Sequence, residues 1–188
     1  MTPEEYYRKY LEGDDEAIGG VIDGLYSDLM RFVEGILGNY HDAEDVVQEV
    51  FIRISLKKSI YRGNGTFGAW VYKIARNCAI NAWKGRMSIL QRLEMDEEKL
   101  NSIAGPMEED PQEQCLLMEE QENFIRSLGR LNEEHRQILY LMYIKDFSPA
   151  EIAKVMGMRP RRAYKIIEKA RESYRRMMEE GGDEYEEH

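Results

Sequence analysis

The stretch from Lys57 to Met87 combines three kinds of side chain that bind unpaired nucleic-acid strands. It contains no aspartate or glutamate, although the 188-residue chain carries 36 acidic and 26 basic residues and a formal net charge of −10. Lysine and arginine neutralise phosphates and release counterions, and asparagine amides pair with base edges. Aromatic rings stack on unpaired bases, at roughly 1–3 kcal/mol for each base. The composition of the stretch therefore favours a surface for separated strands, which needs all three.

A helical pattern over residues 66–86 predicts how this stretch divides into two faces. Apolar residues recur at every third or fourth position, and they predict a core-facing stripe of Phe67, Val71, Ile74, Ala75, Cys78 and Ala82. The opposite side is expected to carry Tyr72, Lys73, Arg76, Asn77, Trp83 and Lys84. Trp70 lies next to the apolar stripe, so we expect it to pack in the core. Tyr72 is equally compatible with packing and with nucleic-acid binding.

The preceding segment, HDAEDVVQEVFIRI, predicts an amphipathic helix over residues 43–57. Its apolar stripe consists of Ala43, Val47, Val50, Phe51 and Ile54. Asp42 occupies the expected N-cap position. The adjacent stripe consists of Asp45, Gln48, Glu49 and Ile52. Periodicity leaves two interpretations open, a well-capped surface helix and a docking face for a basic partner.

A second group of basic residues, nearer the C-terminus, lies in a pattern typical of a helix-turn-helix. Ser148, Pro149 and Glu151 predict a capping box at the start of a short helix, with Gly157 in the turn and Pro160 at the start of the next helix. That helix is expected to bury Ala163, Ile166, Ile167, Ala170 and Tyr174. Its outward side would present Arg159, Arg161, Arg162, Tyr164, Lys165 and Lys169 to a major groove. A basic helix within a purely structural three-helix unit is the alternative.

Residues 25–87 resemble region 2 of bacterial extracytoplasmic-function sigma factors, members of the sigma-70 family. The resemblance is carried by DAEDVVQEVF, by the F-x-x-W-x-Y-x-I-A-R-N run that starts at Phe67, and by the basic end at Lys84 and Arg86. It implies that the clamp helices of the RNA polymerase β′ subunit are bound by Asp42, Glu44, Asp45, Gln48, Glu49 and Ile52. It also implies that the −10 promoter element is bound and melted by Arg62, Asn64, Tyr72, Lys73, Arg76, Asn77, Asn81, Trp83, Lys84 and Arg86. The loop 62–66 would form part of a pocket for a flipped base.

The segment LNEEHRQILYLMYIKDFSPAEIAKVMG is similar to region 4 of the same family, which binds the −35 element and the polymerase β flap. The resemblance implies −35 contacts from Arg159, Arg161, Arg162, Tyr164, Lys165 and Lys169. The recognition helix departs from the family pattern, because RRAYKI stands where a small residue and then Thr-Val-Lys-Ser-Arg are usual. The −35 preference therefore stays open, and a contact driven mainly by phosphates is an alternative. The implied partners are core RNA polymerase, promoter DNA and an anti-sigma factor that the sequence does not identify.

Helical spacing of apolar residues along the whole chain predicts an all-α fold of two small helical domains joined by a flexible acidic linker. The expected helices cover residues 17–37, 43–57, 66–86, 119–130, 133–145, 149–156 and 160–178. The expected boundaries are 1–90 for the region 2-like domain, 91–118 for the linker, 119–180 for the helix-turn-helix domain and 181–188 for a disordered acidic tail.

Other classes of protein find little support in the sequence. Two cysteines without paired spacing fit a reducing cytoplasm, and no stretch approaches the roughly 18 apolar residues of a membrane span. The first residues also lack the basic and apolar regions of a signal peptide. We therefore expect a cytoplasmic protein with no membrane insertion.

Catalysis and metal binding are equally unsupported. The three histidines have no metal-type spacing, and the G-x-G-x-x-G match at 63–68 lacks the preceding strand of a dinucleotide site. We expect no catalytic residue, metal or cofactor. The alternative function is a sigma-like accessory regulator that binds polymerase or DNA without initiating transcription. A conventional helix-turn-helix repressor would leave DAEDVVQEVF and the Lys57–Met87 stretch unexplained.

Overall fold

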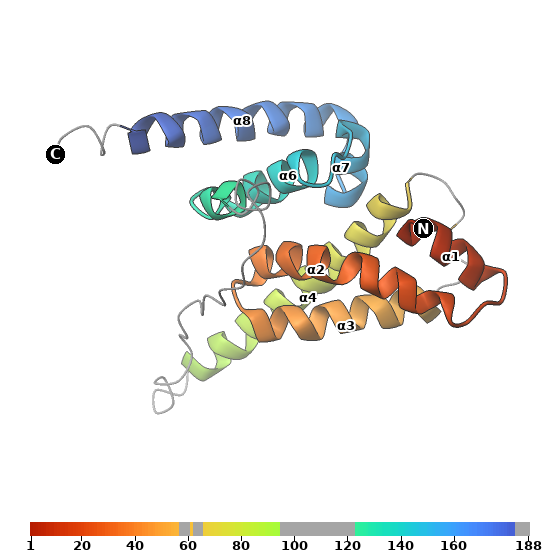
Figure 1. The fold of residues 1–188 in the computed structure, drawn as a ribbon. Helices are drawn as coiled ribbons and strands as arrows, with labels where there is room; N and C mark the ends of the chain where they lie inside the picture. The colour runs from red at the N-terminus through yellow and green to blue at the C-terminus, as the bar shows by residue number, and fades with distance from the viewer. Residues whose placement is uncertain (57–60, 62–65, 95–122, 183–188) are drawn as a thin grey trace. The chain divides into compact units, whose positions relative to one another are not determined.

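The computed structural model describes residues 1–56, 61, 66–94 and 123–182, and the regular secondary structure within these ranges is helical (Figure 1). The described residues fall into two compact units, one within 1–94 and the other within 123–182. This confirms an all-α protein with two helical parts. Beyond residue 94 the predicted linker lies outside the described residues, as does the predicted tail from residue 183.

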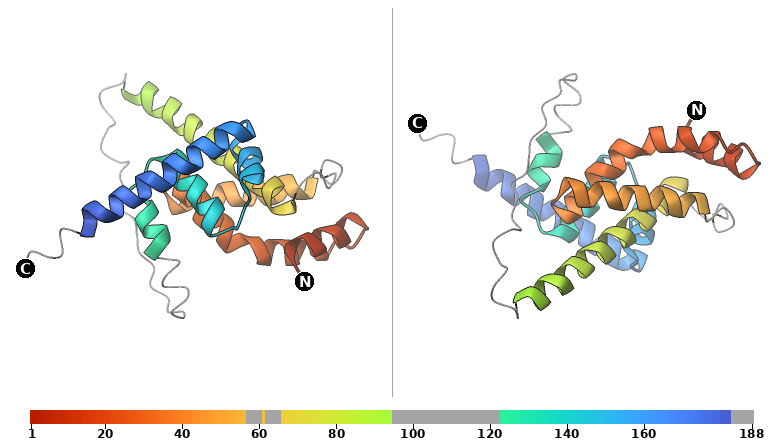
Figure 2. Two further views of the ribbon diagram at one scale, coloured as in Figure 1. Left: turned by 90° about the horizontal axis from the view of Figure 1, so that it is seen from above. Right: turned by 90° about the horizontal axis from the view of Figure 1, so that it is seen from below.

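The first unit is a bundle of α1 (Pro3–Leu11), α2 (Ala17–Leu37), α3 (Tyr40–Leu56) and α4 (Phe67–Glu94). α2 and α3 lie side by side, and α4 packs against both (Figures 1 and 2). The core contains Leu25, Leu29, Val33, Val47, Val50, Ile54, Val71 and Ala75. All five residues of the apolar stripe predicted for α3 are buried, so that prediction is confirmed. The C-terminal part of α4 projects beyond the other helices (Figure 2), and residues 81–85 are exposed there.

The sequence predicted the bounds of α2 correctly but placed the start of α3 too late. α2 coincides with the predicted 17–37, and it ends at Gly38, which has the left-handed φ of 68° that glycine tolerates. α3 begins at Tyr40, before the predicted start, because Asn39 Oδ1 accepts the backbone N–H of Asp42 at 2.9 Å. The prediction of Asp42 as the N-cap is therefore wrong.

Helix α1 was not among the predicted elements. A capping box begins it, in which Glu5 N donates to Thr2 Oγ1 at 3.3 Å and Thr2 N donates to Glu5 Oε2 at 2.7 Å. α1 packs closely on α2, where two glycines one helical turn apart leave room for it. A Cβ atom would lie 2.5 Å from the Tyr6 ring if added at Gly20, and 2.8 Å from Pro3 Cγ if added at Gly24. These glycines permit the close approach of the two helices.

The second unit contains a helical segment at 123–128, then α6 (Glu133–Tyr143), α7 (Pro149–Met156) and α8 (Pro160–Gly182). α8 packs against both α6 and α7 (Figure 1). The predicted helix-turn-helix is confirmed, with α7 at the predicted 149–156, a left-handed φ of 66° at Gly157, and Pro160 at the start of α8. α8 extends to Gly182, beyond the predicted end at residue 178.

Ser148 caps α7 as the sequence predicted. Its hydroxyl accepts the backbone N–H of Glu151 at 3.4 Å, and the Glu151 carboxylate accepts the N–H of Ser148 at 2.8 Å. Replacing Ser148 with alanine is expected to lower the free energy of unfolding by about 0.5–2 kcal/mol, because the first turn of α7 loses an acceptor. Urea unfolding measures the loss, and Ser148→Thr, which keeps the oxygen, is the matched control. Equal stability of the alanine and threonine variants would contradict the assigned role of the cap.

Candidate functional site

Four polar side chains form a continuous exposed stripe along α4. Lys73, Asn77, Asn81 and Lys84 are all exposed and follow one another at spacings of four, four and three residues. At about 100° of rotation per residue, they lie within roughly 80° of one another around the helix. The predicted exposure of Lys73, Asn77 and Lys84 on one side of α4 is confirmed. We call these four residues the α4 stripe.

Two neighbours extend the α4 stripe. Arg76 is half-buried beside it, and the Trp83 indole is 45 % exposed. The stretch from residue 50 to residue 93 contains nine basic residues and no acidic one. Residues 73–86 of α4 thus offer cations, amides and an exposed ring, with no carboxylate among them that would repel phosphates.

Tyr72 and Ala82 lie opposite to their predicted sides. Tyr72 is 1 % exposed, and its ring packs edge-on against Phe32 with a centroid distance of 5.0 Å. Its spacing to the buried Ala75 and Ala79 places it on the core side of the helix. The prediction that Tyr72 lies on the nucleic-acid side is therefore wrong. Ala82, predicted to be in the core, is exposed because α4 has left the bundle at that point.

Trp70 lies in a cluster of rings that joins α4 to α1. We call Tyr7, Tyr61, Phe67 and Trp70 the aromatic cluster. The Trp70 ring centroid lies 5.3 Å from that of Tyr61 and 5.6 Å from that of Tyr7, which confirms that Trp70 packs. The predicted −10 contacts Arg62 and Asn64 lie between Tyr61 and Phe67 in the sequence and are outside the described residues.

Arg86 is paired with Asp42 inside the first unit. Its Nη1 lies 2.5 Å from Asp42 Oδ2, and both side chains are about two-fifths exposed, at 39 % and 42 %. Arg86 follows Lys73 by thirteen positions, which places it about 140° around the helix from Lys73. It therefore faces α3 and lies away from the α4 stripe.

The Asp42–Arg86 pair is expected to contribute less than about 1 kcal/mol to stability, because water screens both partners. A double-mutant cycle with Asp42→Asn and Arg86→Gln, followed by urea unfolding, measures the coupling. The coupling should shrink at high ionic strength. A coupling that high salt leaves intact would show that the pair is effectively buried.

The side chains predicted for docking on α3 differ in their contacts. Asp45, Gln48 and Ile52 are exposed, with Ile52 at 58 %, and within the described residues none of them makes a hydrogen bond or an ion pair. Their spacings of three and four residues place them on one face of α3. This face combines one carboxylate, one amide and one apolar side chain, all available to a partner.

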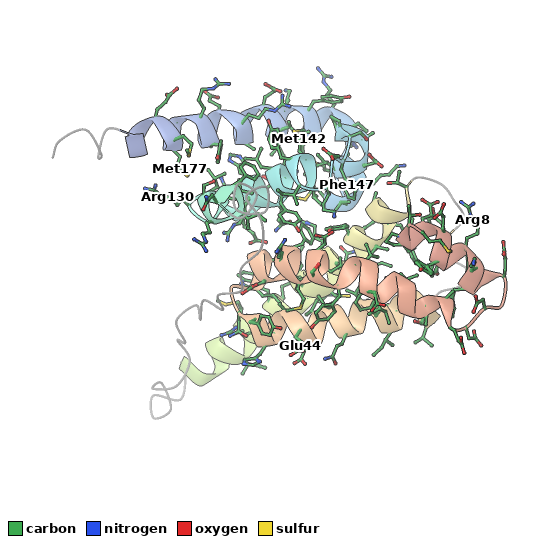
Figure 3. The ribbon with its side chains drawn as sticks, in the orientation of Figure 1. Arg8, Glu44, Arg130, Met142, Phe147 and Met177 are labelled. Atoms are coloured by element: carbon green, nitrogen blue, oxygen red, sulfur yellow. The ribbon has the colours of Figure 1, made fainter. Side chains whose placement is uncertain are left out.

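The other three predicted docking residues are half-buried and already paired. The pairs are Asp42–Arg86, Glu44–Tyr26 and Glu49–Arg53. The Tyr26 hydroxyl donates to Glu44 Oε1 at 3.5 Å, and Figure 3 shows Glu44 projecting from α3. Arg53 Nε donates to Glu49 Oε1 at 2.9 Å, and this bond is the main cause of the raised pKa of Arg53.

Arg53 and Tyr26 were not among the predicted site residues. Because Glu49 and Arg53 are four residues apart on one helix, their ion pair could have been predicted from the sequence. Tyr26 belongs to a different helix from Glu44, so no local pattern could have identified its contact.

The basic residues predicted for the second unit lie as expected. All six residues predicted to face a major groove are exposed, just before and along the first half of α8: Arg159, Arg161, Arg162, Tyr164, Lys165 and Lys169. The opposite side buries Ala163, Ile166, Ile167 and Ala170, which confirms the predicted division, while Tyr174 is half-buried. Arg162 Nη2 lies 3.5 Å from Glu134 Oε1, and because the two side chains are 66 % and 43 % exposed, water screens the pair and it separates at little cost.

Arg171 fixes α8 to α6. Its Nε donates to the Tyr143 hydroxyl at 3.2 Å, and its Nη2 lies 3.4 Å from the sulfur of Met142, which Figure 3 shows on α6 next to α8. The bond to Tyr143 is also the main cause of the raised pKa of Arg171. These contacts orient α8, so Arg171 has a structural role that the exposed Lys165 and Lys169 do not share.

The described residues offer neither a metal site nor a membrane-spanning helix. Among them, no three His, Cys, Asp or Glu side chains gather as a metal would require. None of the helices in 1–56, 66–94 and 123–182 is both long enough and apolar enough to cross a bilayer.

Comparisons with known proteins match both units. The family model described as Sigma-70 region 2 matches residues 21–88, and the model described as Sigma-70, region 4 matches residues 121–173. Together they cover more than half of the chain. The region 2 match contains α3 and the α4 stripe, and the region 4 match contains α6, α7 and most of α8.

Relatives and solved structures agree with these matches. The chain is 24 % identical over 182 residues to the ECF RNA polymerase sigma factor SigW of Bacillus subtilis, covering 95 % of this chain and 97 % of SigW. Its fold is similar to that of CnrH, solved with the cytosolic domain of CnrY, at a TM-score of 0.62 and 19 % identity, covering 93 % and 95 % of the two chains. It is also similar to the sigma factor RpoE of Bartonella quintana, solved with the anti-sigma factor NepR, at a TM-score of 0.60 and 18 % identity, covering 84 % and 94 %. The chain therefore belongs to the sigma-70 family, as a promoter-recognising RNA polymerase sigma factor of the extracytoplasmic-function type.

Proposed function

We propose that this sigma factor docks on core RNA polymerase through α3, holds the −35 element with α8, and opens the −10 region with α4. The observation that carries the proposal is the α4 stripe, which presents two cations and two amides in one row, within a stretch of the sequence that has no acidic residue from 50 to 93. Separated strands expose both phosphates and base edges, and this row can bind both.

Docking on the β′ clamp helices falls mainly to Asp45, Gln48 and Ile52. Within the described residues the side chains of these three make no hydrogen bond or ion pair, so binding them to a basic surface breaks no internal contact. Asp42, Glu44 and Glu49 would each have to be shared with Arg86, Tyr26 or Arg53. We assign to them the orientation of α3 and an electrostatic contribution to docking.

Opening of the −10 region falls to the α4 stripe with Arg76 and Trp83. Lys73 and Lys84 neutralise phosphates, while Asn77 and Asn81 pair with base edges. The exposed Trp83 ring offers a stacking surface. Tyr72 is excluded from this set by its burial, and Arg86 contacts DNA only after it leaves Asp42. For Arg62 and Asn64, the proposed contact with the −10 strand rests only on the resemblance to sigma region 2.

The −35 element is assigned to the start of α8. Its bulky, basic sequence favours contacts to phosphates over reading of base edges. We therefore propose a broad −35 preference for this protein, with Arg161 and Lys165 as the main cations. The second unit would also contact the β flap of polymerase.

The protein would then act without a catalytic centre of its own. Sigma factors are transcription initiation factors, and we propose that this chain contributes binding and strand separation alone, in the cytoplasm, where core polymerase works. We count an anti-sigma factor among its partners, since RpoE of Bartonella quintana was solved with one.

In vitro transcription tests the proposal. Purified protein and core polymerase are incubated with a library of random promoter templates, and the transcripts are sequenced. Defined start sites preceded by a shared −10 sequence are expected. If polymerase binds the protein but yields no defined start sites, the accessory regulator becomes the better account.

A further inference from the structure

Helix α1 fixes the point at which the chain leaves α3. The Tyr7 hydroxyl donates to the carbonyl of Ile54 at 3.2 Å, and the Tyr10 hydroxyl donates to the carbonyl of Ser55 at 3.3 Å. Both carbonyls belong to the last turn of α3, where backbone acceptors have no partner within the helix. The two phenols therefore replace a helix cap.

The same helix also contacts Tyr61 and the start of α4. The Tyr7 ring stacks on Phe67 at a centroid distance of 4.8 Å and meets Tyr61 edge-on at 5.9 Å. The Tyr61 hydroxyl donates to Glu4 Oε1 at 3.2 Å. Burial, and next the charge of Glu4, raises the pKa of Tyr61, so its hydroxyl keeps its proton at neutral pH.

These contacts give Tyr61 a role different from base stacking. Its ring already has three aromatic neighbours, Tyr7, Phe67 and Trp70, and its hydroxyl is bonded to Glu4. A base that stacked on Tyr61 would have to compete with these contacts. Tyr61 is therefore suited to hold the start of α4 against α1.

We propose that α1 positions the DNA-binding helix α4 of this sigma factor, with Tyr61 as the positioning residue that joins Glu4 and Tyr7 of α1 to Phe67 and Trp70 of α4. The inference rests on the proposed function, in which the α4 stripe contacts the opened strand. α1 lies outside residues 21–88, which the region 2 model matches. A helix that fixes the start of α4 favours strand opening without touching DNA, because binding groups act only in a narrow range of positions.

Two substitutions at Tyr61 test the proposal in the complex with core polymerase. Tyr61→Ala removes the ring and the hydroxyl, and it should lower the rate of promoter opening about tenfold, since misplaced groups lose much of their effect. Tyr61→Phe keeps the ring in the cluster and should retain most of that rate. Permanganate reactivity of unpaired thymines reports opening, and a binding titration reports affinity for core polymerase, which should stay within about twofold for both variants because the α3 face is unchanged.

A matched pair of glycine variants tests the helix itself. Gly20→Ala pushes a methyl group into the Tyr6 ring, whereas a Cβ at the adjacent Gly19 meets nothing within 4 Å. Gly20→Ala should therefore displace α1 and lower opening, and Gly19→Ala should leave opening unchanged. Melting temperatures of all four variants show how much of any loss is unfolding.

The outcomes separate the inference from the function on which it rests. Absence of opening by the unaltered protein would reject the proposed function. Normal opening by the unaltered protein and by Tyr61→Ala would overturn the positioning role. Equal opening by Gly20→Ala and Gly19→Ala would overturn the part assigned to α1, and losses of opening that only parallel lost polymerase binding would reduce Tyr61 to a structural residue.

Discussion

With Asp45 replaced by arginine, we expect the protein to bind core polymerase on the order of a hundredfold more weakly, because a like charge then faces a basic docking surface. Asp45 is exposed and makes no internal contact among the described residues, so the substitution leaves the packing of α3 intact. Fluorescence polarisation with labelled protein and a titration of core polymerase measures the affinity. Melting temperature should change little.

The matched control for this experiment is Asp23→Arg. The Asp23 side chain is exposed on α2 and makes no hydrogen bond or ion pair within the described residues, so it undergoes the same change of charge on a different helix. Its variant should bind polymerase within about twofold of the unaltered protein, because solvent ions screen a single exposed charge that does not belong to the docking face. Equal weakening by both variants would indicate a general charge effect and reject the α3 face.

Charge reversal at Glu49 would be a poorer experiment, for a reason that the structure supplies. Glu49 accepts two hydrogen bonds from Arg53, so its loss leaves a cation without a partner and disturbs α3 as well as any docking contact. The same holds for Asp42 with Arg86. The sequence pattern could not distinguish these residues from Asp45, because it shows faces of a helix but not the partners on other helices.

The elements that sequence reasoning located well are those with strong local signals. α2 ends at a glycine, and α7 begins with Ser148 and Pro149 and ends at Gly157. α1 also has a local signal, the Thr2–Glu5 capping box, but its buried residues are Tyr7 and Tyr10. Their rings fill the core while their hydroxyls bond to carbonyls of α3, so no aliphatic stripe marked the helix.

The site residues also differ in whether a local sequence signal was enough to place them. Exposure of the α4 stripe follows from helical periodicity, because the apolar side of α4 is well marked. Tyr72 was ambiguous because tyrosine suits both a core and a nucleic-acid surface, and only its contact with Phe32 of α2 decides. Arg86 and Asp42 are separated by 44 residues, so their pairing depends on how α3 and α4 pack.

For the α4 stripe we expect Lys73→Ala with Lys84→Ala to flatten the salt dependence of binding to an unpaired −10 strand. Each phosphate contact on single-stranded DNA contributes a slope of about 0.7 in a plot of log affinity against log salt concentration, so the double variant should lose about 1.4. Fluorescence anisotropy of the polymerase complex with a labelled single-stranded −10 oligonucleotide, over a series of salt concentrations, gives the slope. Asn77→Ala should instead keep the slope and weaken binding to a subset of sequences, because an amide that pairs with a base edge releases no counterion.

The control for the lost charge is Lys9→Ala, an exposed lysine of α1 with no contact among the described residues. It should leave both the slope and the sequence preference unchanged. An unaltered slope in the double-lysine variant would mean that strand phosphates are neutralised elsewhere. A reduced slope for Asn77→Ala would mean that this amide acts on the backbone, and the division of the α4 stripe into cations for phosphates and amides for bases would then be wrong.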